Sequence, residues 1–300
     1  MIRKREGILR IAVQKSGRLS ELCNDLLARC GVDFGTGSKR GLLCRAENLP
    51  VELMLVRDDD IPSYVRDGVC DIGIVGLNEY REKITDAGED EKDLRLVRGM
   101  EFGHCRLAIA VPENMVYDGP VSLQGKRIAT SYPNILRRFL EQAGVDARLV
   151  EITGSVEVTP AIGVADAICD LVSTGATLAS NGLREVTTVL ESEAIMVQNT
   201  AVSDPGKERM LNRLLERIDG VIKAGKSRYI MMNAPSGAVD AISRLIPGME
   251  YPTIVPVGTD GKQVAIHAVA PEVVFWETME QLKEAGASSI LVVPIEKIID

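Results

Sequence analysis

The sequence predicts an α/β protein whose carboxy-terminal part is a separate βαββαβ domain. Short apolar runs alternate with segments of helical spacing from residue 8 onward, which is typical of layered, largely parallel sheets. The pattern changes near residue 228 to strand, helix, two strands, helix and strand, the ferredoxin-like arrangement. A chain of 300 residues is also too long for one small core. These observations together predict three structural units.

The first unit begins with apolar runs that have the length of buried strands. Strands are expected at 8–13, 51–56 and 71–76, and helices over 19–31 and 61–70. Gly31 is a suitable stop for the first of these helices because glycine adopts the left-handed conformation at a helix end.

A second α/β unit is expected to begin near His104. Its elements are, in order, strand 106–112, strand 126–133, helix 134–145, strand 147–153 and an apolar run over 163–172. Residues 187–199 have the pattern of strands that return to the first unit. Residues 203–225 form an amphipathic helix that connects to the carboxy-terminal domain.

Composition limits the classes of partner. The formal net charge of −8 argues against a nucleic-acid or membrane-surface binder, since both require a net basic face. No apolar run approaches the length of a membrane span or of a signal-peptide core. Six scattered cysteines without a C-x-x-C pair are typical of reduced thiols, so we expect a cytoplasmic protein.

The sharpest local feature is a turn of small and hydroxyl residues that follows Asp170. It comprises Ser173, Thr174, Gly175, Ala176 and Thr177. Uncrowded backbone N–H groups and hydroxyls of this kind can hold a phosphate without a fixed positive charge. Asp166 and Asp170 come just before it and could accept hydrogen bonds from the diol of a ribose 5-phosphate. A polar turn with no ligand remains the alternative.

Cations gather after two predicted strands. Lys15 and Arg18 flank Ser16 and Gly17 after the first strand, and Arg57 directly follows the strand 51–56. Ligands bind at the carboxyl ends of strands in α/β sheets, so these cations are candidates for a diphosphate site. Solvated loops and a helix N-cap at Asp58–Asp60 are the structural alternatives.

Three further charged residues are candidates for ligand contacts. Asp71 leads into a glycine-containing strand, Glu157 lies among small and apolar residues, and Arg40 is an isolated cation. The chain contains no Ser-His-Asp pattern, no H-E-x-x-H motif and no Walker loop. Its chemistry would therefore rest on electrostatics and positioning instead of a protein nucleophile.

Four ordered segments and the tail together resemble a known family. The segments are RIAVQKSGRLSELCNDLLARCGV, VRDDDIPSYVRDGVCDIGIVG, KRIATSYPNILRRFL and GSVEVTPAIGVADAICDLVSTGATLASNGLREV, and the tail carries YIMM, PTIVP and GASSILVVPIEK. The chain resembles ATP phosphoribosyltransferase in its long form, the first enzyme of histidine biosynthesis. The resemblance covers nearly the whole chain.

The resemblance implies two catalytic domains similar to periplasmic binding proteins and a ferredoxin-like regulatory domain that binds histidine. It implies domain I at 1–104 with 195–225, domain II at 105–194 and the regulatory domain at 226–300. The implied reaction joins ATP and phosphoribosyl pyrophosphate (PRPP) into N1-phosphoribosyl-ATP with release of diphosphate. Mg²⁺ as cofactor, histidine as inhibitor, AMP as a further ligand and a homo-oligomer (dimer or hexamer) are implied as well.

Residue roles also follow from the resemblance. Residues 173–177 would hold the sugar 5-phosphate, and Asp170, ranked above Asp166, would contact the ribose. Lys15, Arg18, Arg40 and Arg57 would surround the diphosphate or the nucleotide phosphates. Asp71 and Glu157 would line the nucleotide. The histidine site would include Asn233, Thr253, Ser288 and Ser289.

Two other function classes fit part of the pattern. A non-catalytic sensor of phosphate ligands and amino acids would not require Lys15, Arg18 and Arg57. A salvage phosphoribosyltransferase would leave the βαββαβ tail without a purpose.

Overall fold

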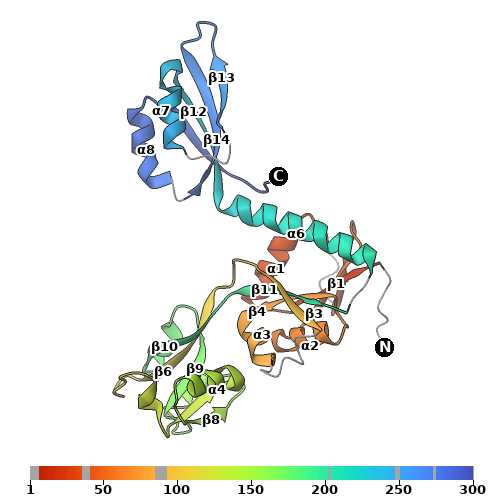
Figure 1. Cartoon of the computed structure of the whole chain (residues 1–300), viewed down its shortest axis with the longest axis vertical. Coiled ribbons are helices and arrows are strands. Elements are labelled where there is room, and N and C mark those ends of the chain that lie inside the picture. The colour runs from red at the N-terminus through yellow and green to blue at the C-terminus, as the bar shows by residue number, and fades with distance from the viewer. Residues whose placement is uncertain are drawn as a thin grey trace. The chain divides into compact units, whose positions relative to one another are not determined.

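The computed structural model describes residues 7–35, 41–84, 93–201, 204–246, 251–272 and 275–299 (Figure 1). The chain divides into two compact units. One comprises Met1–Asp25 and Val32–Met210, and the other comprises Leu26–Gly31 and Leu211–Asp300. The predicted fold class is confirmed by the mixed α/β architecture of the first unit and by the βαββαβ order of the second.

The first unit contains a lobe built on the strand order β2-β3-β1-β4-β11-β5, called the first lobe below. Its strands are β1 (Leu9–Gln14), β2 (Leu43–Arg45), β3 (Val51–Val56), β4 (Ile72–Gly76), β5 (Leu94–Gly99) and β11 (Ala194–Asn199). Its helices are α1 (Arg18–Arg29), α2 (Ile61–Arg66) and α3 (Leu77–Lys83). The expected strands 8–13, 51–56 and 71–76 are confirmed, and β1 pairs in parallel with both β3 and β4.

The second lobe of this unit is built on the order β10-β6-β9-β7-β8. Its strands are β6 (Cys105–Pro112), β7 (Arg127–Thr130), β8 (Arg148–Glu151), β9 (Ala167–Val172) and β10 (Leu183–Ser192). Its helices are α4 (Pro133–Gln142) and α5 (Ala176–Ser180). Apolar side chains of α4 such as Leu136 pack on Leu107 and Ile128 of the sheet. The helical spacing of apolar residues over 134–145 thus places one face of α4 against the sheet.

The sheets are mixed, whereas the sequence predicted largely parallel layers. β7 is parallel to β8 and β9, but β6 and β10 are antiparallel to their neighbours, as are β5 and β11. These strands carry the chain from one lobe to the other and back (Figure 1). The N–H of Met100 donates to Ala194 O (2.8 Å), and the N–H of Ala194 donates to Phe102 O (2.9 Å). The two crossings are therefore hydrogen-bonded to each other.

The second unit contains the carboxy-terminal sheet, in the order β13-β14-β12-β15. Its strands are β12 (Ser227–Pro235), β13 (Thr253–Val257), β14 (Gln263–Pro271) and β15 (Ser288–Pro294), and its helices are α7 (Val239–Leu245) and α8 (Phe275–Glu284). Figure 1 shows α7 and α8 on the same side of this sheet, where Ile242 and Leu282 pack against Ile230 and Ile266. Helix α6 (Pro205–Gly225) precedes β12.

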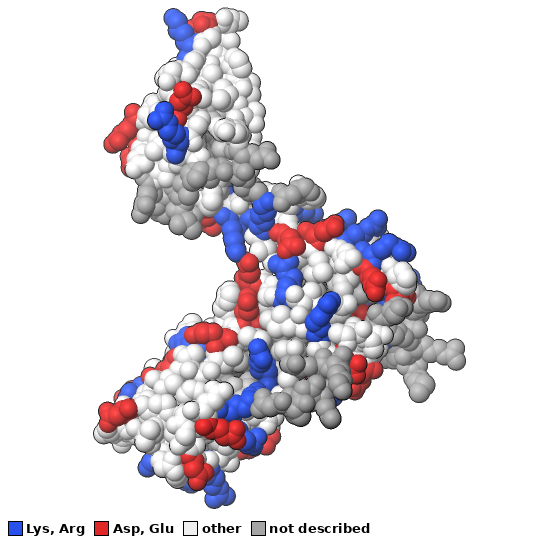
Figure 2. Space-filling model, viewed as in Figure 1, with Lys and Arg blue, Asp and Glu red and all other residues white. Residues whose placement is uncertain are grey.

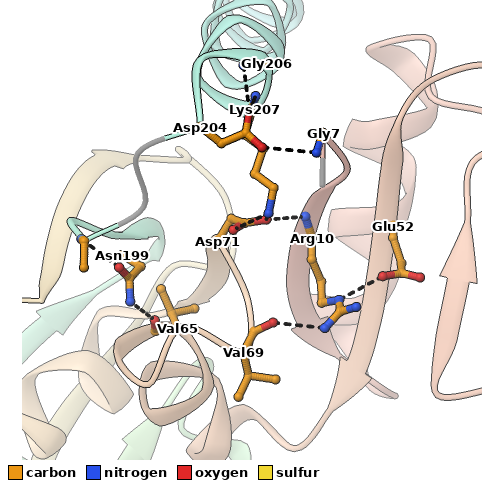
Figure 3. Close-up of polar contacts among 11 residues, drawn as sticks. Gly7, Arg10, Glu52, Val65, Val69, Asp71, Asn199, Asp204, Gly206 and Lys207 are labelled. Carbon is orange, nitrogen blue, oxygen red and sulfur yellow. Dashed lines mark hydrogen bonds and ion pairs between the residues drawn. The ribbon is translucent and has the colours of Figure 1, made fainter. Parts of the chain in front are cut away.

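A buried ion pair attaches the start of α6 to the first lobe (Figure 3). Lys207 Nζ lies 3.0 Å from both carboxylate oxygens of Asp71, and both side chains are at most 5% exposed. The N–H of Arg10 also donates to Asp71 Oδ2 (2.9 Å). Asp204 caps α6 by accepting from the N–H of Gly206 (2.8 Å) and accepts from the N–H of Gly7 (3.1 Å).

A neighbouring pair extends this network. Arg10 Nε donates to Glu52 Oε1 (2.8 Å), and Arg10 Nη1 donates to Val69 O (3.2 Å), so β1 is joined by side chains to β3 and to the segment before β4. The Nδ2 of Asn199, at the end of β11, donates to Val65 O (2.7 Å). These contacts join the strand ends of the first lobe around Asp71 (Figure 3).

We predict that Lys207→Met destabilises the first unit by about 3–5 kcal/mol, because it leaves the Asp71 carboxylate buried without its counter-charge. Urea denaturation followed by circular dichroism measures this change. Arg95→Met is the matched control: the exposed Arg95 contacts Gln198 (2.7 Å), and its loss should change stability by less than about 0.5 kcal/mol. Equal losses in both variants would contradict the prediction.

Candidate functional site

The turn after β9 presents unoccupied backbone donors. Gly175 has φ +79°, a left-handed conformation that suits glycine, and it precedes α5. The N–H groups of residues 174–177 donate to no acceptor among the described residues. Ser173, Thr174 and Thr177 are exposed. The structure therefore brings three hydroxyls and several free N–H groups together, as a phosphate seat requires.

Two aspartates beside this turn have opposite environments. Asp166 is bound by Arg127, whose Nη2 and Nε donate to its two oxygens (2.9 and 3.2 Å), and this holds the pKa of Asp166 at about 2. Asp170 is half-buried, and burial raises its pKa, although the Leu171 N–H that it accepts (2.8 Å) lowers it. Asp166 is thus engaged by an arginine within the protein, and the contact of Asp170 with a ribose stays a prediction.

Glu157 lies near Asp170. It belongs to a short helical turn, Val156–Val158, that packs against β9 through buried Val156, and the preceding Ser155 has φ +50°. The charge of Glu157 contributes to the raised pKa of Asp170. The structure therefore places these two carboxylates within electrostatic reach of each other.

The cations of the first lobe meet at the carboxyl ends of neighbouring strands. Gln14 is paired with Val56, and the N–H of Lys15 donates to Val56 O (2.8 Å), so Lys15 and Arg57 follow adjacent strand ends. Lys15 is exposed. The Arg57 side chain is 72% exposed, and its Nε contacts Asp59 Oδ1 (3.0 Å). Both cations remain accessible to an anion.

Arg18 is the first residue of α1 and is exposed. Gly17 before it has φ +95°, so the turn between β1 and α1 depends on a glycine at this position. Burial raises the pKa of the Cys105 thiol at the start of β6, and the nearby charge of Arg18 opposes this rise. Arg18 therefore lies close to the crossing between the lobes.

Two of the sequence-based candidates do not join this group. Asp71 is 2% exposed and its carboxylate binds Lys207 and the Arg10 N–H, so the structure gives it a structural role in place of the expected one at the nucleotide (Figure 3). Arg40 lies outside the described residues.

The expected histidine-site residues lie on the carboxy-terminal sheet. Asn233 of β12 pairs with Ser288 of β15, and Ser288 Oγ lies 3.4 Å from Asn233 O. Ser289 has φ +52° beside an irregularity in this pairing. Thr253 pairs with His267 of β14, and His267 pairs with Met231 of β12. Asn233 and Ser288 are thus adjacent, whereas Thr253 lies two strands from β12.

Sequence reasoning missed a polar cluster that joins the lobes. Glu79 and Glu82 of α3 are each 8% exposed and contact residues 132–135 at the start of α4. An available signal was that α4 begins with Pro133 after Tyr132, so the helix has no Ser, Thr, Asp or Asn at its N-cap position. A partner from elsewhere in the chain was therefore required.

Basic and acidic side chains are interspersed on the face that Figure 2 shows, without one continuous basic surface. Among the described residues, no helix is both long and apolar enough to cross a membrane. The same residues contain no group of three or more His, Cys, Asp or Glu side chains arranged to hold a metal ion.

Two family models match this chain, and solved structures of several kinds are similar to it. The model described as ATP phosphoribosyltransferase matches residues 57–220, and the model of the HisG C-terminal domain matches residues 224–297. The ATP phosphoribosyl transferase (HisG:HisZ) complex from Thermotoga maritima matches at 29% identity and a TM-score of 0.58, over 71% of this chain and 99% of that chain. The alkanesulfonate-binding protein SsuA from Xanthomonas axonopodis pv. citri matches at 17% identity and a TM-score of 0.45, over 74% and 76%.

We predict that Asp170→Asn raises the thermal unfolding midpoint of the ligand-free protein at pH 7. A carboxyl whose folded-state pKa is raised opposes folding when ionised, so the gain should disappear as the pH falls to the unfolded-state pKa of about 3.9. Calorimetry at several pH values measures this.

Asp166→Asn is the control, and we expect it to lower the thermal unfolding midpoint at pH 7 instead of raising it. The pKa of Asp166 is lowered, so its stabilising contribution is present above about pH 3.9 and is lost as the pH falls through about 2. A lower midpoint for Asp170→Asn than for the wild type at pH 7 would contradict the prediction. It would show that the ionised Asp170 stabilises the ligand-free protein.

Proposed function

We propose residue roles for a reaction that follows from family membership: the chain belongs to the ATP phosphoribosyltransferase family. It transfers the phosphoribosyl group of PRPP to N1 of ATP and releases diphosphate, in histidine biosynthesis. The observation that carries our assignment is the turn after β9, with its free N–H groups next to the half-buried Asp170.

In this proposal the turn Ser173–Thr177 binds the 5-phosphate of PRPP. The free N–H groups donate to the phosphate oxygens, and the exposed hydroxyls of Ser173, Thr174 and Thr177 add further donors. Asp170 at the end of β9 accepts from the ribose hydroxyls. Its burial favours this, because a carboxylate with few solvent contacts gains more from a ligand donor.

Lys15, Arg18 and Arg57 bind the diphosphate. Negative charge grows on this leaving group as the bond from C1 of the ribose breaks, while the sugar becomes oxocarbenium-like. Cations at the diphosphate therefore stabilise the transition state more than the ground state, as catalysis requires. Their exposure and their position at adjacent strand ends support this role.

The adenine N1 carries an in-plane lone pair and needs no general base before it attacks C1. Glu157 would accept from the exocyclic amine of the adenine, and Arg40 remains a candidate for the nucleotide phosphates. We leave Asp71 out of the site because its carboxylate already has partners inside the protein. Mg²⁺ is the proposed cofactor: when bound, it would neutralise the diphosphate, with Asp170 as the protein carboxylate nearest to the sugar.

We propose a regulatory role for the carboxy-terminal domain, with histidine as its ligand and AMP as a further ligand of the enzyme. Asn233, Thr253, Ser288 and Ser289 are the proposed histidine contacts. A distant domain can inhibit only by favouring one of two global arrangements, which a homo-oligomer (dimer or hexamer) provides. The proposed domain boundaries remain as predicted from the sequence: domain I comprises 1–104 and 195–225, domain II comprises 105–194, and the regulatory domain comprises 226–300.

Both substrates are cytoplasmic metabolites, so we expect the enzyme in the cytoplasm. The alternative of a non-catalytic sensor has less support.

The first test places a negative charge in the phosphate seat. We expect Thr174→Asp to raise the KM for PRPP by at least about tenfold, because the carboxylate repels the 5-phosphate and competes for its donors. The assay follows the near-ultraviolet absorbance of N1-alkylated adenine with ATP, PRPP, Mg²⁺ and pyrophosphatase.

The control for this test is Thr188→Asp, the same change at an exposed position of β10 in the same lobe. It should leave the KM within about twofold of the wild type. An unchanged KM for Thr174→Asp would remove the turn from the PRPP site, and a wild-type chain that forms no product would contradict the proposed activity itself.

The second test concerns histidine. We expect Asn233→Ala to raise the histidine concentration for half-inhibition by at least about tenfold, the effect of losing one charge-assisted hydrogen bond, without changing the uninhibited rate. Glu280→Ala on the exposed face of α8 is the control. Equal inhibition of Asn233→Ala and wild type would place the histidine site elsewhere.

A further inference from the structure

Helix α3 carries buried carboxylates that the proposed reaction does not use. Glu79 and Glu82 are each 8% exposed, and burial raises the pKa of both. Burying a carboxylate is costly unless it is well hydrogen-bonded, so each requires a compensating contact. In both cases that contact is with the other lobe.

Glu82 caps a helix that belongs to the second lobe. Its Oε1 accepts from the N–H of Asn134 (2.9 Å) and its Oε2 from the N–H of Ile135 (3.0 Å), which are among the unsatisfied donors at the start of α4. Asn134 Nδ2 donates in return to Glu82 O (3.1 Å). Arg138, one turn further along α4, donates to Arg81 O (2.6 Å) and Ile84 O (3.2 Å). One face of α4 is thus held by α3.

Glu79 completes the contact through Tyr132. The Tyr132 hydroxyl donates to Glu79 Oε1 (2.7 Å) and accepts from Asn78 Nδ2 (3.1 Å). Asn78 is fixed by Ser192, whose Oγ donates to Asn78 Oδ1 (2.9 Å) and accepts from the Asn78 N–H (3.2 Å). Ser192 is the last residue of β10, where the chain returns to the first lobe. Below, the interlobe clasp means Asn78, Glu79, Glu82, Tyr132 and the first turn of α4.

The clasp lies next to the proposed ribose ligand. β7 is parallel to β9 and pairs Thr130 with Cys169, so the segment that leads from β7 to Tyr132 runs beside Asp170. Burial raises the pKa of Tyr132, and the charges of Glu79 and Asp170 add to this rise, which places Tyr132 within electrostatic reach of both. On the other side, α3 directly follows β4, the neighbour of β1.

We infer that Glu82 is a positioning residue for phosphoribosyl transfer: by capping α4 from α3, it sets the place of Asp170 relative to Lys15 and Arg57. This rests on the roles proposed above for those three residues. Transfer requires the sugar, held by the second lobe, and the diphosphate cations of the first lobe to be aligned within a fraction of an ångström. The cations of the first lobe are proposed to bind the diphosphate more strongly in the transition state than in the ground state. Loss of the cap should therefore lower kcat more than it raises the KM for PRPP.

The test uses Glu82→Gln in the full chain. The amide keeps one acceptor but turns an NH₂ group toward the second N–H, so one of the two cap bonds and the negative charge are lost with little change in volume. We expect kcat to fall at least about tenfold while the KM for PRPP stays within about threefold, measured well below the unfolding temperature. Hydrogen exchange should show faster exchange at Asn134 and Ile135 than in the wild type.

The matched control is Glu52→Gln, which breaks the ion pair of the buried Glu52 with Arg10 (2.8 Å) between β3 and β1 inside the first lobe. It removes a glutamate charge without touching the clasp and should keep kcat within about twofold of the wild type. A milder clasp variant, Asn134→Ala, removes the side-chain bond to Glu82 O and an exposed bond from Arg137 Nη1 (2.9 Å), but it keeps both backbone bonds to the Glu82 carboxylate. It should lower kcat by about threefold, which keeps the test usable if Glu82→Gln does not fold.

Three results would overturn the inference. These are an unchanged kcat in Glu82→Gln, a raised KM for PRPP at constant kcat, or a kcat that falls in both Glu82→Gln and Glu52→Gln in proportion to the loss of stability. The wild-type chain, assayed in parallel, separates this from the proposed function. If the proposed function is wrong, the wild-type chain forms no product. If only the inference is wrong, the wild type is active and the ratio of the Glu82→Gln kcat to the wild-type kcat stays near one.

Discussion

The buried ion pair between Asp71 and Lys207 is the contact on which the arrangement of the first lobe depends. Two charges removed from water gain little net stability, but either one alone in the interior is costly, so the pair permits few alternative arrangements. Asp71 accepts from Lys207 and from the Arg10 N–H, and its own N–H donates to Arg10 O (2.9 Å). The start of α6, the strand β4 and the strand β1 are therefore held in one register (Figure 3).

β4 links this contact to the proposed site. Asp71 stands just before the strand, and α3 with its two buried glutamates follows at the other end. β1 lies beside β4 in the sheet and β3 lies beside β1, and these two strands are followed directly by Lys15 and Arg57. The cations and the glutamates of α3 are thus carried by neighbouring elements of the first lobe, while Asp170 and the turn after it are carried by β9 of the second lobe. The proposed reaction uses residues of both lobes and therefore requires their alignment, and the glutamates of α3 contact the second lobe directly.

Much of this could be predicted from local patterns. Apolar runs such as residues 51–56 predicted strands correctly, and the small residues after Asp170 predicted the turn, because both depend on neighbours in sequence. Long-range partners could not be predicted. Asp71 was assigned to the nucleotide because it precedes a glycine-containing strand, but its partner Lys207 is 136 residues away. Glu82 reads as an ordinary helix-surface residue until α4, 52 residues on, supplies its N–H donors. The return of residues 187–199 to the first lobe was predicted and is confirmed, but the antiparallel direction of the crossing strands was missed for the same reason.

The most direct test of the central claim is a crystal structure of the full chain with PRPP and Mg²⁺. We expect the 5-phosphate to lie within hydrogen-bond distance of the N–H groups of residues 174–177, with a ribose hydroxyl on Asp170 and the diphosphate directed toward Lys15 and Arg57. Binding of the 5-phosphate by the cations of the first lobe, with the turn after β9 left unoccupied, would contradict the assignment of the site.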